Sequence, residues 1–307
     1  MLKHSLPKVT ILMCTFNGEK YIEDQLDSFQ CQTYQNWRLI VSDDGSTDRT
    51  LQILNRYKKK WSARKIQIVK GPQQGFSANF MSLLQNKKYR GDYFFLSDQD
   101  DVWMPKKIED YLIIFNQRKK VSLVGGYTTY VDPNLSILGN SIKFNHKPCF
   151  SNALVQSMFG GNTIAINAKF KKQLESLNIK NVSSHDWLLY ILNTFIGNNC
   201  YFMKESRIFY RQHPDALVGK NTDFKSICKR FRIFISGKHR SHIAQNIDVI
   251  KEIKLSTPKN SLLLEEFILL RDGNLFDKIK ILLKGNFRRY SNYGFFVVFF
   301  GAFFKKI

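Results

Sequence analysis

Short apolar runs alternate with amphipathic segments through the first hundred residues of the chain. Each run is rich in β-branched or large apolar residues and ends at polar or turn-forming residues, which predicts buried strands. The strands are predicted at residues 9–16, 37–42, 65–70 and 93–103. Between them, residues 19–32 and 51–61 place apolar side chains at helical spacing. This alternation predicts an α/β fold with a mostly parallel central sheet flanked by helices.

Three of these strands end in polar or acidic residues. They are Thr15 and Asn17 after the first strand, Asp43 and Asp44 after the second, and Asp98 and Asp100 after the fourth. The carboxyl ends of parallel strands meet at one edge of a sheet, where α/β proteins bind ligands, so we expect these side chains to converge. Neither GxGxxG nor GxxxxGK[ST] follows the first strand, which argues against common dehydrogenases and P-loop enzymes.

The run from residue 93 to 103, YFFLSDQDDVW, carries the most informative acids. Asp98 and Asp100 are two residues apart, and such positions share one face of an extended segment. Close carboxylates repel each other unless a cation compensates, and clustered oxygen ligands suit Mg²⁺ or Mn²⁺. The alternative is an acidic turn in which Asp101 caps the next helix. The other acidic strand ends favour the metal hypothesis.

The chain has 307 residues and a formal net charge of +22, which implies an anionic partner such as nucleic acid, a phosphorylated substrate or a membrane surface. Five scattered cysteines without a CxxC pair favour a reducing cytoplasm over a disulfide framework or a zinc site. We interpret the apolar N-terminal run as a first strand rather than a signal peptide. No stretch reaches the roughly 20 apolar residues of a membrane span.

Six short motifs follow one another along the chain: TFNGEKYI, VSDDGSTDRT, GFSANF, LSDQDDVW, GGN and HDW. This succession resembles the family 2 inverting glycosyltransferases with the GT-A fold, over about residues 7–215. The run SDQDDVW with a later YRQH resembles the bacterial rhamnosyltransferase-like branch. The resemblance implies a catalytic domain over residues 1–220. Its nucleotide-binding half would cover about 1–120 and its acceptor half about 121–220.

The resemblance also implies roles at the donor site. Asp44, or its neighbour Asp43, matches the acid that hydrogen-bonds the pyrimidine ring, and a carboxylate can accept the N3–H of uracil or thymine. A capping turn is the alternative for both acids. Asn79 matches a position near the donor's phosphates, with helix N-capping as the alternative. Trp103 would either line the sugar pocket or be a core aromatic. The remaining donor contacts implied are Thr15, Asn17, Glu19 and Asp98.

A divalent cation, Mn²⁺ or Mg²⁺, would bridge the two donor phosphates, with Asp98, Asp100 and His213 as its implied ligands. Asp186 matches the family's catalytic base, which takes the proton of the acceptor hydroxyl. The alternative for Asp186 is an acid favoured by the dipole at a helix start. The acceptor pocket is expected to include Gly160, Gly161, Asn162, His185, Trp187 and Arg211.

Residues 221–307 differ in character, because from residue 222 onward 17 Lys and Arg face only 7 Asp and Glu, a net charge of +10. Helices are predicted over residues 224–253 and 261–270. The run at 295–304, FFVVFFGAFF, is flanked by basic residues and is too short to span a bilayer. A basic, aromatic-rich segment suits a membrane interface. The alternative is a helical cap on the catalytic domain or a contact in a homo-oligomer.

The leading hypothesis is an inverting glycosyltransferase, cytoplasmic and peripherally associated with the inner face of the cell membrane. Its donor would be dTDP-rhamnose, or alternatively a UDP-sugar, and its acceptor a lipid-linked or growing surface glycan. A nucleic-acid-binding protein is a more distant alternative, because the charge is spread out and no groove-reading motif occurs. A nucleotidyltransferase is also not favoured, because it would need a Gly-rich phosphate loop near the first strand, and TFNGEKYI contains one glycine. An inactive scaffold is not favoured, because every expected acid is present.

Overall fold

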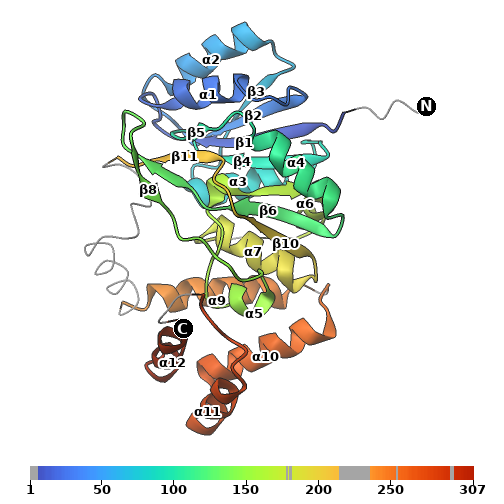
Figure 1. The fold of residues 1–307 in the computed structure, drawn as a ribbon, viewed down its shortest axis with the longest axis vertical. Helices are drawn as coiled ribbons and strands as arrows, with labels where there is room; N and C mark the ends of the chain where they lie inside the picture. Colours follow the sequence, from blue (N-terminus) through green and yellow to red (C-terminus); the bar gives the residue numbers. More distant parts are fainter. Residues whose placement is uncertain (1–5, 178, 180–181, 214–235, 254, 291–293) are drawn as a thin grey trace, which may run out of the picture.

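The computed structural model describes residues 6–177, 179, 182–213, 236–253, 255–290 and 294–307. A seven-stranded sheet in the order β10–β6–β9–β4–β1–β2–β3 forms its centre, and a four-stranded sheet in the order β5–β11–β7–β8 lies beside it (Figure 1). The strands are β1 (Val9–Thr15), β2 (Trp37–Asp43), β3 (Ile66–Lys70), β4 (Tyr93–Ser97), β5 (Val102–Trp103), β6 (Val121–Gly126), β7 (Thr129–Val131), β8 (Ile137–Asn140), β9 (Ala165–Asn167), β10 (Asn199–Met203) and β11 (Ile208–Arg211). In the central sheet β9 pairs antiparallel with β4 and β6, while the other pairs are parallel.

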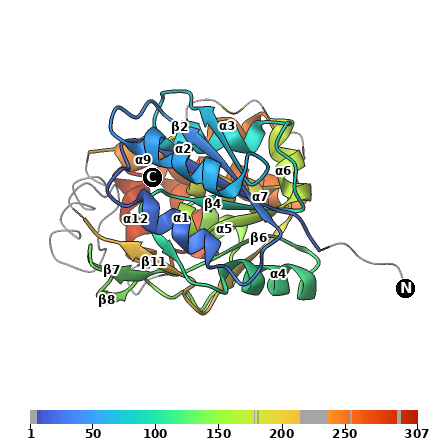
Figure 2. The same cartoon turned by 90° about the horizontal axis from the view of Figure 1, so that it is seen from above.

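Helices cover both faces of the central sheet, so the predicted α/β architecture is confirmed. They are α1 (Ile22–Gln30), α2 (Thr50–Trp61), α3 (Phe76–Gln85), α4 (Lys107–Gln117), α5 (Phe150–Ala153), α6 (Ala168–Glu175), α7 (His185–Phe195), α9 (Lys238–Lys251), α10 (Pro258–Asp272), α11 (Leu275–Lys284) and α12 (Gly294–Phe303), with a 3₁₀ turn η1 (Gly161–Thr163). Figure 2 shows α3 and α6 on the far side of the sheet from α4.

The side chains on the two faces of β1 pack in two separate hydrophobic clusters. Ile11 and Met13 pack with α1, α2 and α4, whereas Leu12 and Cys14 pack with α3, α6 and α7. Alternate residues of a strand point to opposite faces, and a strand covered on both faces is therefore apolar throughout. This is why residues 9–16 read as one continuous apolar run.

The predicted strand over residues 93–103 is two strands, β4 and β5, which belong to different sheets. β4 ends at Ser97, and the acids at 98, 100 and 101 occupy the connection. β5 then pairs antiparallel with β11 instead of extending β4. Because α4 begins only at Lys107, Asp101 does not cap it, and that alternative is wrong.

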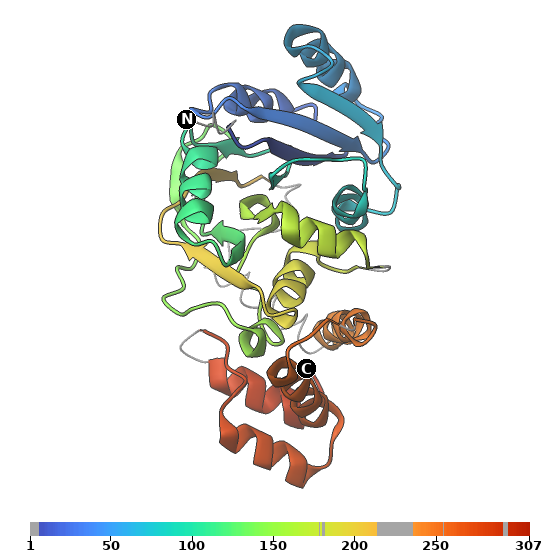
Figure 3. The same cartoon turned by 90° about the vertical axis from the view of Figure 1, so that its right-hand side faces the viewer.

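The basic C-terminal helices pack on the α/β part of the structure (Figures 1 and 3). Ile247 of α9 and Phe267 of α10 belong to the same hydrophobic cluster as the buried side of α7. The Asn260 amide of α10 donates hydrogen bonds to the carbonyls of Thr194 and Phe195 at the end of α7, at 2.8 and 2.9 Å. Among the described residues, no helix has both the length and the apolar character needed to cross a membrane.

Both predicted C-terminal helices have counterparts, with different bounds. The helix predicted over residues 224–253 corresponds to α9, and residues 214–235 lie outside the described part of the chain. The helix predicted over residues 261–270 is α10, which begins earlier because Thr257 caps it, accepting from the Asn260 N–H at 3.2 Å. Pro258 occupies its first turn, where a missing N–H costs no hydrogen bond.

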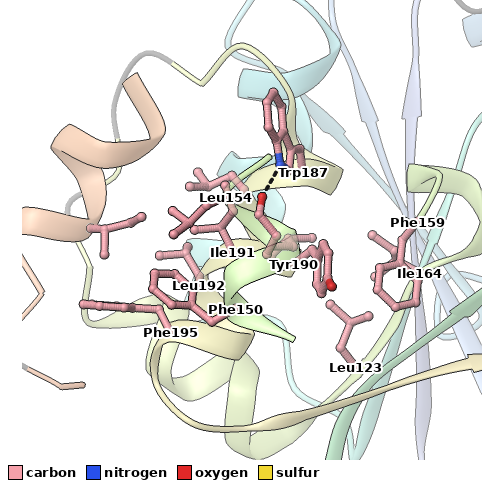
Figure 4. Close-up of a cluster of buried hydrophobic side chains, with 14 of the residues drawn as sticks. Leu123, Phe150, Leu154, Phe159, Ile164, Trp187, Tyr190, Ile191, Leu192 and Phe195 are labelled. Carbon is pink, nitrogen blue, oxygen red and sulfur yellow. Dashed lines mark hydrogen bonds between the residues drawn. The ribbon is translucent and has the colours of Figure 1, made fainter. Parts of the chain in front are cut away.

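Helix α7 is fixed by polar anchors inside this apolar cluster (Figure 4). The indole N–H of Trp187 donates to the Ala153 carbonyl at 2.7 Å. The Tyr190 hydroxyl accepts from the backbone N–H of Cys149 at 2.9 Å and donates to Asn152 at 3.1 Å. Buried polar groups cost free energy unless they are paired. Rotating α7 would break these hydrogen bonds, so they fix its orientation. The orientation of its first turn, which carries Asp186, follows from them.

Replacing Phe267 with Ala should lower the free energy of unfolding by about 3–5 kcal/mol, because its ring is fully buried in the cluster shared with α7. The control is Leu283→Ala on α11, where the side chain is 83% exposed and the change should stay within about 0.5 kcal/mol. Denaturant unfolding followed by circular dichroism measures both. If the loss of stability appeared only in a separate minor unfolding transition, α10 and α7 would not share one core.

Candidate active site

The loops that follow β1 and β2 are joined by reciprocal hydrogen bonds. The Asn17 side-chain oxygen accepts from the Thr47 N–H, and the Asn17 N–H donates to the Ser46 hydroxyl, both at 2.9 Å. Glu19 accepts from the backbone N–H of Arg49 at 2.9 Å and from its guanidinium at 3.1 Å. Asn17 has a φ of +47°, in the left-handed region that Asn tolerates better than most residues. Asn17 and Glu19 therefore shape this edge of the sheet, and their contact with a donor stays a prediction.

The two acids at the end of β2 are buried and bonded to protein groups. Asp43 accepts from the Thr15 hydroxyl at 2.7 Å and from the hydroxyl and N–H of Ser46 at 2.6 and 2.9 Å. Asp44 accepts from two backbone N–H groups of the β3–α3 loop at 2.6 and 2.9 Å. Both acids thus organise turns, as the alternative interpretation expected. Each carboxylate oxygen has more than one acceptor position, so this role leaves room for a ligand N–H.

Asn79 lies inside α3 and does not cap it, because the N-terminal capping position is Gly75. Its amide donates to the Ser42 carbonyl at 2.9 Å and ties α3 to the end of β2. The Asn79 side-chain oxygen is buried and has no hydrogen-bond partner among the described residues. The helix-capping alternative for Asn79 is therefore wrong, and a contact with donor phosphates stays a prediction.

The acids after β4 crowd together. Burial, reinforced by the negative charges of Asp100 and Asp186, raises the pKa of Asp98 to about 7. Asp101 is fully buried and accepts from the Asn162 amide at 2.7 Å. Burial, followed by the charges of Asp100 and Asp98, raises the pKa of Asp101 well above its usual range. The influence of Asp186 on Asp98 shows that the start of α7 and the end of β4 meet at one place.

A buried cation, Lys107, faces these acids. Its ammonium donates to the Asn162 carbonyl at 2.7 Å and lies 3.8 Å from the ring centroid of Trp103. Burial lowers the pKa of Lys107 to about 7, although Asp101 and Asp98 oppose the shift. Sequence reasoning missed this residue. The available signal was a lysine in the first turn of a helix, where the helix dipole disfavours a positive charge.

Trp103 is buried in the core, with its ring edge-to-face against Phe29 at a centroid distance of 4.7 Å. This position agrees with the core-aromatic interpretation of Trp103. Phe16 and Phe76 instead expose aromatic rings beside the sheet edge, with exposed fractions of 57% and 44%. The Gln99 amide holds the Phe16 backbone through two bonds of 2.9 Å. The expected donor residues included neither Phe16 nor Gln99, although an exposed aromatic directly after a strand was visible in the sequence.

His213 and Asp100 come together although they lie far apart in the sequence. The His213 Nε2 atom is 3.0 Å from an Asp100 carboxylate oxygen. Arg211 is buried, and its guanidinium donates to the Asp100 carbonyl at 3.0 Å and to Asp24 at 2.7 Å. Arg211 thereby fixes β11 to the acid-bearing connection, and its predicted contact with an acceptor is untested.

The side chains near the end of β4 offer the kind of ligand atoms that a hard divalent cation prefers. Asp98 and Asp100 supply carboxylate oxygens, and the pKa of Asp98 is raised partly by neighbouring negative charge that a cation would offset. The buried Nδ1 atom of His213 has no hydrogen-bond partner among the described residues. Within the same described ranges, no three His, Cys, Asp or Glu side chains form a ready-made metal cluster.

Asp186 lies in the first turn of α7, half-buried, and accepts from the Trp187 N–H at 2.8 Å. The hydroxyl of the N-terminal capping residue, Ser184, bonds the same carboxylate oxygen. The positive end of the helix dipole favours a carboxylate here. Trp187 was expected in the acceptor pocket. Its ring is buried in the core and stacks on His239 at a centroid distance of 5.3 Å.

The GGN turn and the start of α7 are in close contact. A Cβ atom on Gly161 would lie 2.5 Å from the Nε2 atom of His185, so only glycine fits there. His185 is buried and stacks on Phe80 at a centroid distance of 4.3 Å. Both of its ring nitrogens lack a hydrogen-bond partner within the described part of the chain. Gly160 is exposed beside this contact, whereas Asn162 is buried against Asp101.

Solved structures of glycosyltransferases share this fold. TarS from S. aureus in complex with UDP-GlcNAc superposes with a TM-score of 0.58 at 16% identity, covering 90% of this chain and 79% of TarS 1–349. The mannosyltransferase PcManGT from Pyrobaculum calidifontis, solved with GDP-Man and Mn²⁺, gives a TM-score of 0.58 at 17% identity, covering 92% and 76%. The fold is therefore that of the GT-A glycosyltransferases.

The sequence narrows this class to one family. The model of Glycosyl transferase family 2 matches residues 10–175, more than half of the chain. The chain belongs to that family and is a glycosyltransferase. It is also 29% identical over 248 residues to the dTDP-rhamnosyl transferase RfbG of Shigella flexneri, covering 76% of this chain and 82% of that protein.

Asp98→Asn should stabilise the metal-free protein at neutral pH and above. A carboxyl with a raised pKa holds a proton in the folded state that the unfolded chain releases above about pH 3.9, so stability falls as pH rises toward 7. Asparagine removes this loss. The melting temperature should match wild type near pH 4 and exceed it by roughly 10 °C above pH 7, because the raised pKa corresponds to about 4 kcal/mol there.

Thermal unfolding in EDTA across this pH range measures the difference. The control is Asp248→Asn on the exposed side of α9, whose melting temperature should follow wild type throughout. An Asp98→Asn curve parallel to wild type at every pH would contradict a raised pKa at Asp98.

Proposed function

We propose that this glycosyltransferase is an inverting enzyme that uses a nucleotide-diphosphate sugar, with Asp186 as its catalytic base. One observation carries the proposal. His185 at the start of α7 lies against Gly161 of η1, and Asn162 of the same turn donates to Asp101 after β4, so Asp186 and the acids after β4 lie around one turn. An acid at the start of α7 and an acid pair at the end of β4 thus face one space, as a base and a donor-binding group must.

In this proposal, Asp186 accepts the proton of the acceptor hydroxyl while that oxygen attacks the anomeric carbon of the donor sugar. The bond to the nucleoside diphosphate breaks on the opposite face, which inverts the anomeric centre. Base catalysis of this kind typically contributes about 10²- to 10⁴-fold to the rate. Bonds from Ser184 and Trp187 engage one carboxylate oxygen of Asp186 and leave the other to the hydroxyl.

The donor would lie along the carboxyl ends of β1, β2 and β4. Its pyrimidine would contact Asp44 or Asp43, and its diphosphate would lie near Asp98 and Asp100. Asp98, Asp100 and His213 would hold Mg²⁺ or Mn²⁺, which offsets the charge that develops on the departing diphosphate. The Mn²⁺ in the PcManGT complex supports a cation in this fold.

We propose dTDP-rhamnose as the donor, because the chain's RfbG relative is described as a dTDP-rhamnosyl transferase. A UDP-sugar is the alternative, since thymine and uracil present the same N3–H to a carboxylate. TarS, which binds UDP-GlcNAc, supports that alternative at the level of the fold. The acceptor would be a lipid-linked or growing surface glycan, and the enzyme would work while peripherally bound to the inner face of the membrane.

Nucleotide binding tests the donor assignment directly. In a thermal-shift panel of dTDP, UDP, GDP and CDP with and without Mn²⁺ or Mg²⁺, dTDP with metal should stabilise most, by about 2.7 kcal/mol at a hundredfold excess over Kd. Asp100→Asn should remove the metal-dependent part of the shift. A larger shift with UDP would favour the alternative donor. No shift with any nucleotide, in folded protein, would contradict the donor site.

Asp186→Asn should lower the transfer rate by about 10²- to 10⁴-fold and leave nucleotide affinity near wild type, because only the proton acceptor is lost. A matched control is Asp277→Asn, an acid in the first turn of α11, which should transfer normally to a short-chain, water-soluble acceptor. Single-turnover assays with isothermal titration separate chemistry from binding. Near-normal turnover by Asp186→Asn would exclude it as the base.

A further inference from the structure

The outward face of α11 is apolar. Of the nineteen large hydrophobic residues that are exposed in the described part of the chain, ten lie within residues 255–307. On α11 these are Leu275, Phe276, Ile279 and Leu283, with exposed fractions of 60%, 74%, 44% and 83%. Positions three and four apart share one face of a helix. The opposite face of α11 packs inward, so the exposed residues form a continuous stripe.

Helix α12 carries a second stripe, made of aromatic rings. Phe296, Phe300 and Phe304 follow one another at intervals of four residues, and successive ring centroids are 6.4 and 6.2 Å apart. The buried side of the same helix contacts α11, where the Lys278 ammonium donates to the Ala302 carbonyl at 2.7 Å. The two stripes therefore belong to one packed pair of helices.

Basic side chains border these stripes. Lys280, Arg288 and Lys305 are exposed, and Lys284 is exposed while paired with Glu266. Long basic side chains can extend along an apolar surface and keep their charge at its rim. An apolar face with a cationic rim is complementary to a bilayer with anionic headgroups. Double-stranded nucleic acid would use the charge but not the exposed rings, because its bases are already stacked.

The position of α12 fits the same partner. Figures 1 and 2 both place α12 on the side of the molecule that carries β8 and β11. Strand β11 pairs with β5 beside the acid-bearing connection. A surface bound through α12 would therefore lie on the same side of the molecule as the active site.

We infer that the outward faces of α11 and α12 form a lipid-binding surface for an anionic bilayer. The role of this surface rests on the proposed function, because a lipid-linked acceptor would lie in the same bilayer that the surface binds. A second copy of the chain fits less well, since a twofold contact would bring the two cationic rims together. With ten residues, α12 lies in the interface plane instead of spanning it.

Vesicle co-sedimentation of the full chain tests the inference. Wild type should bind vesicles of phosphatidylcholine with phosphatidylglycerol at least about tenfold more tightly than vesicles of phosphatidylcholine alone. The triple variant Phe276→Ser, Leu283→Ser, Phe304→Ser should lose about tenfold or more of this binding. These side chains are exposed, so the variant should remain folded. The matched control Leu51→Ser, Ile113→Ser, Ile137→Ser, also at exposed positions, should bind as wild type does.

The outcomes separate this surface from the proposed transfer reaction. The triple variant should keep the full thermal shift with dTDP and Mn²⁺. Unchanged vesicle binding by the triple variant would overturn the inference. So would a wild-type dimer that does not bind vesicles and that the triple variant dissociates, because the occupant would then be a second copy. Normal vesicle binding without any nucleotide shift would leave the surface in place and reject the transferase site.

Discussion

Four carboxylates are crowded at one edge of the central sheet, and their mutual repulsion constrains the elements around them. Asp98, Asp100 and Asp101 follow one strand, and Asp186 approaches them from α7. The buried ammonium of Lys107 from α4 opposes this charge. Burial, together with the charges of Asp100 and Asp186, still raises the pKa of Asp98 to about 7. Such a site gains stability from added positive charge, which suits a metal-dependent ligand.

The second sheet is tied to the acid-bearing connection. Arg211 lies at the end of β11 and bonds the Asp100 carbonyl, so the acid-bearing connection depends on a strand from far along the chain. Asn162 joins Asp101 to Lys107, because its amide donates to the Asp101 carboxylate and its backbone carbonyl accepts from the Lys107 ammonium. The acids, α4, η1 and β11 thus form a single polar network, and a buried network is stable only when all its members are paired.

Local pattern was enough to predict the strands, the helices between them and the shared edge, because period and turn residues are local properties. It could not predict the network. The pairing of Lys107 with Asn162 depends on long-range packing, and Asp100 and His213 were expected together only from the family resemblance. Trp103 remained open between pocket and core, since an aromatic residue suits both. Near the C-terminus, helices with apolar residues on both sides gave no indication of which side packs inward.

The contact between Gly161 and His185 has a consequence for related sequences. A methyl group at position 161 would overlap the imidazole, so neither position can change size alone without moving η1 or α7. A relative with alanine at the first position should therefore carry a smaller residue at the second. Their joint substitution pattern would identify family members in which the contact between η1 and α7 has been rebuilt.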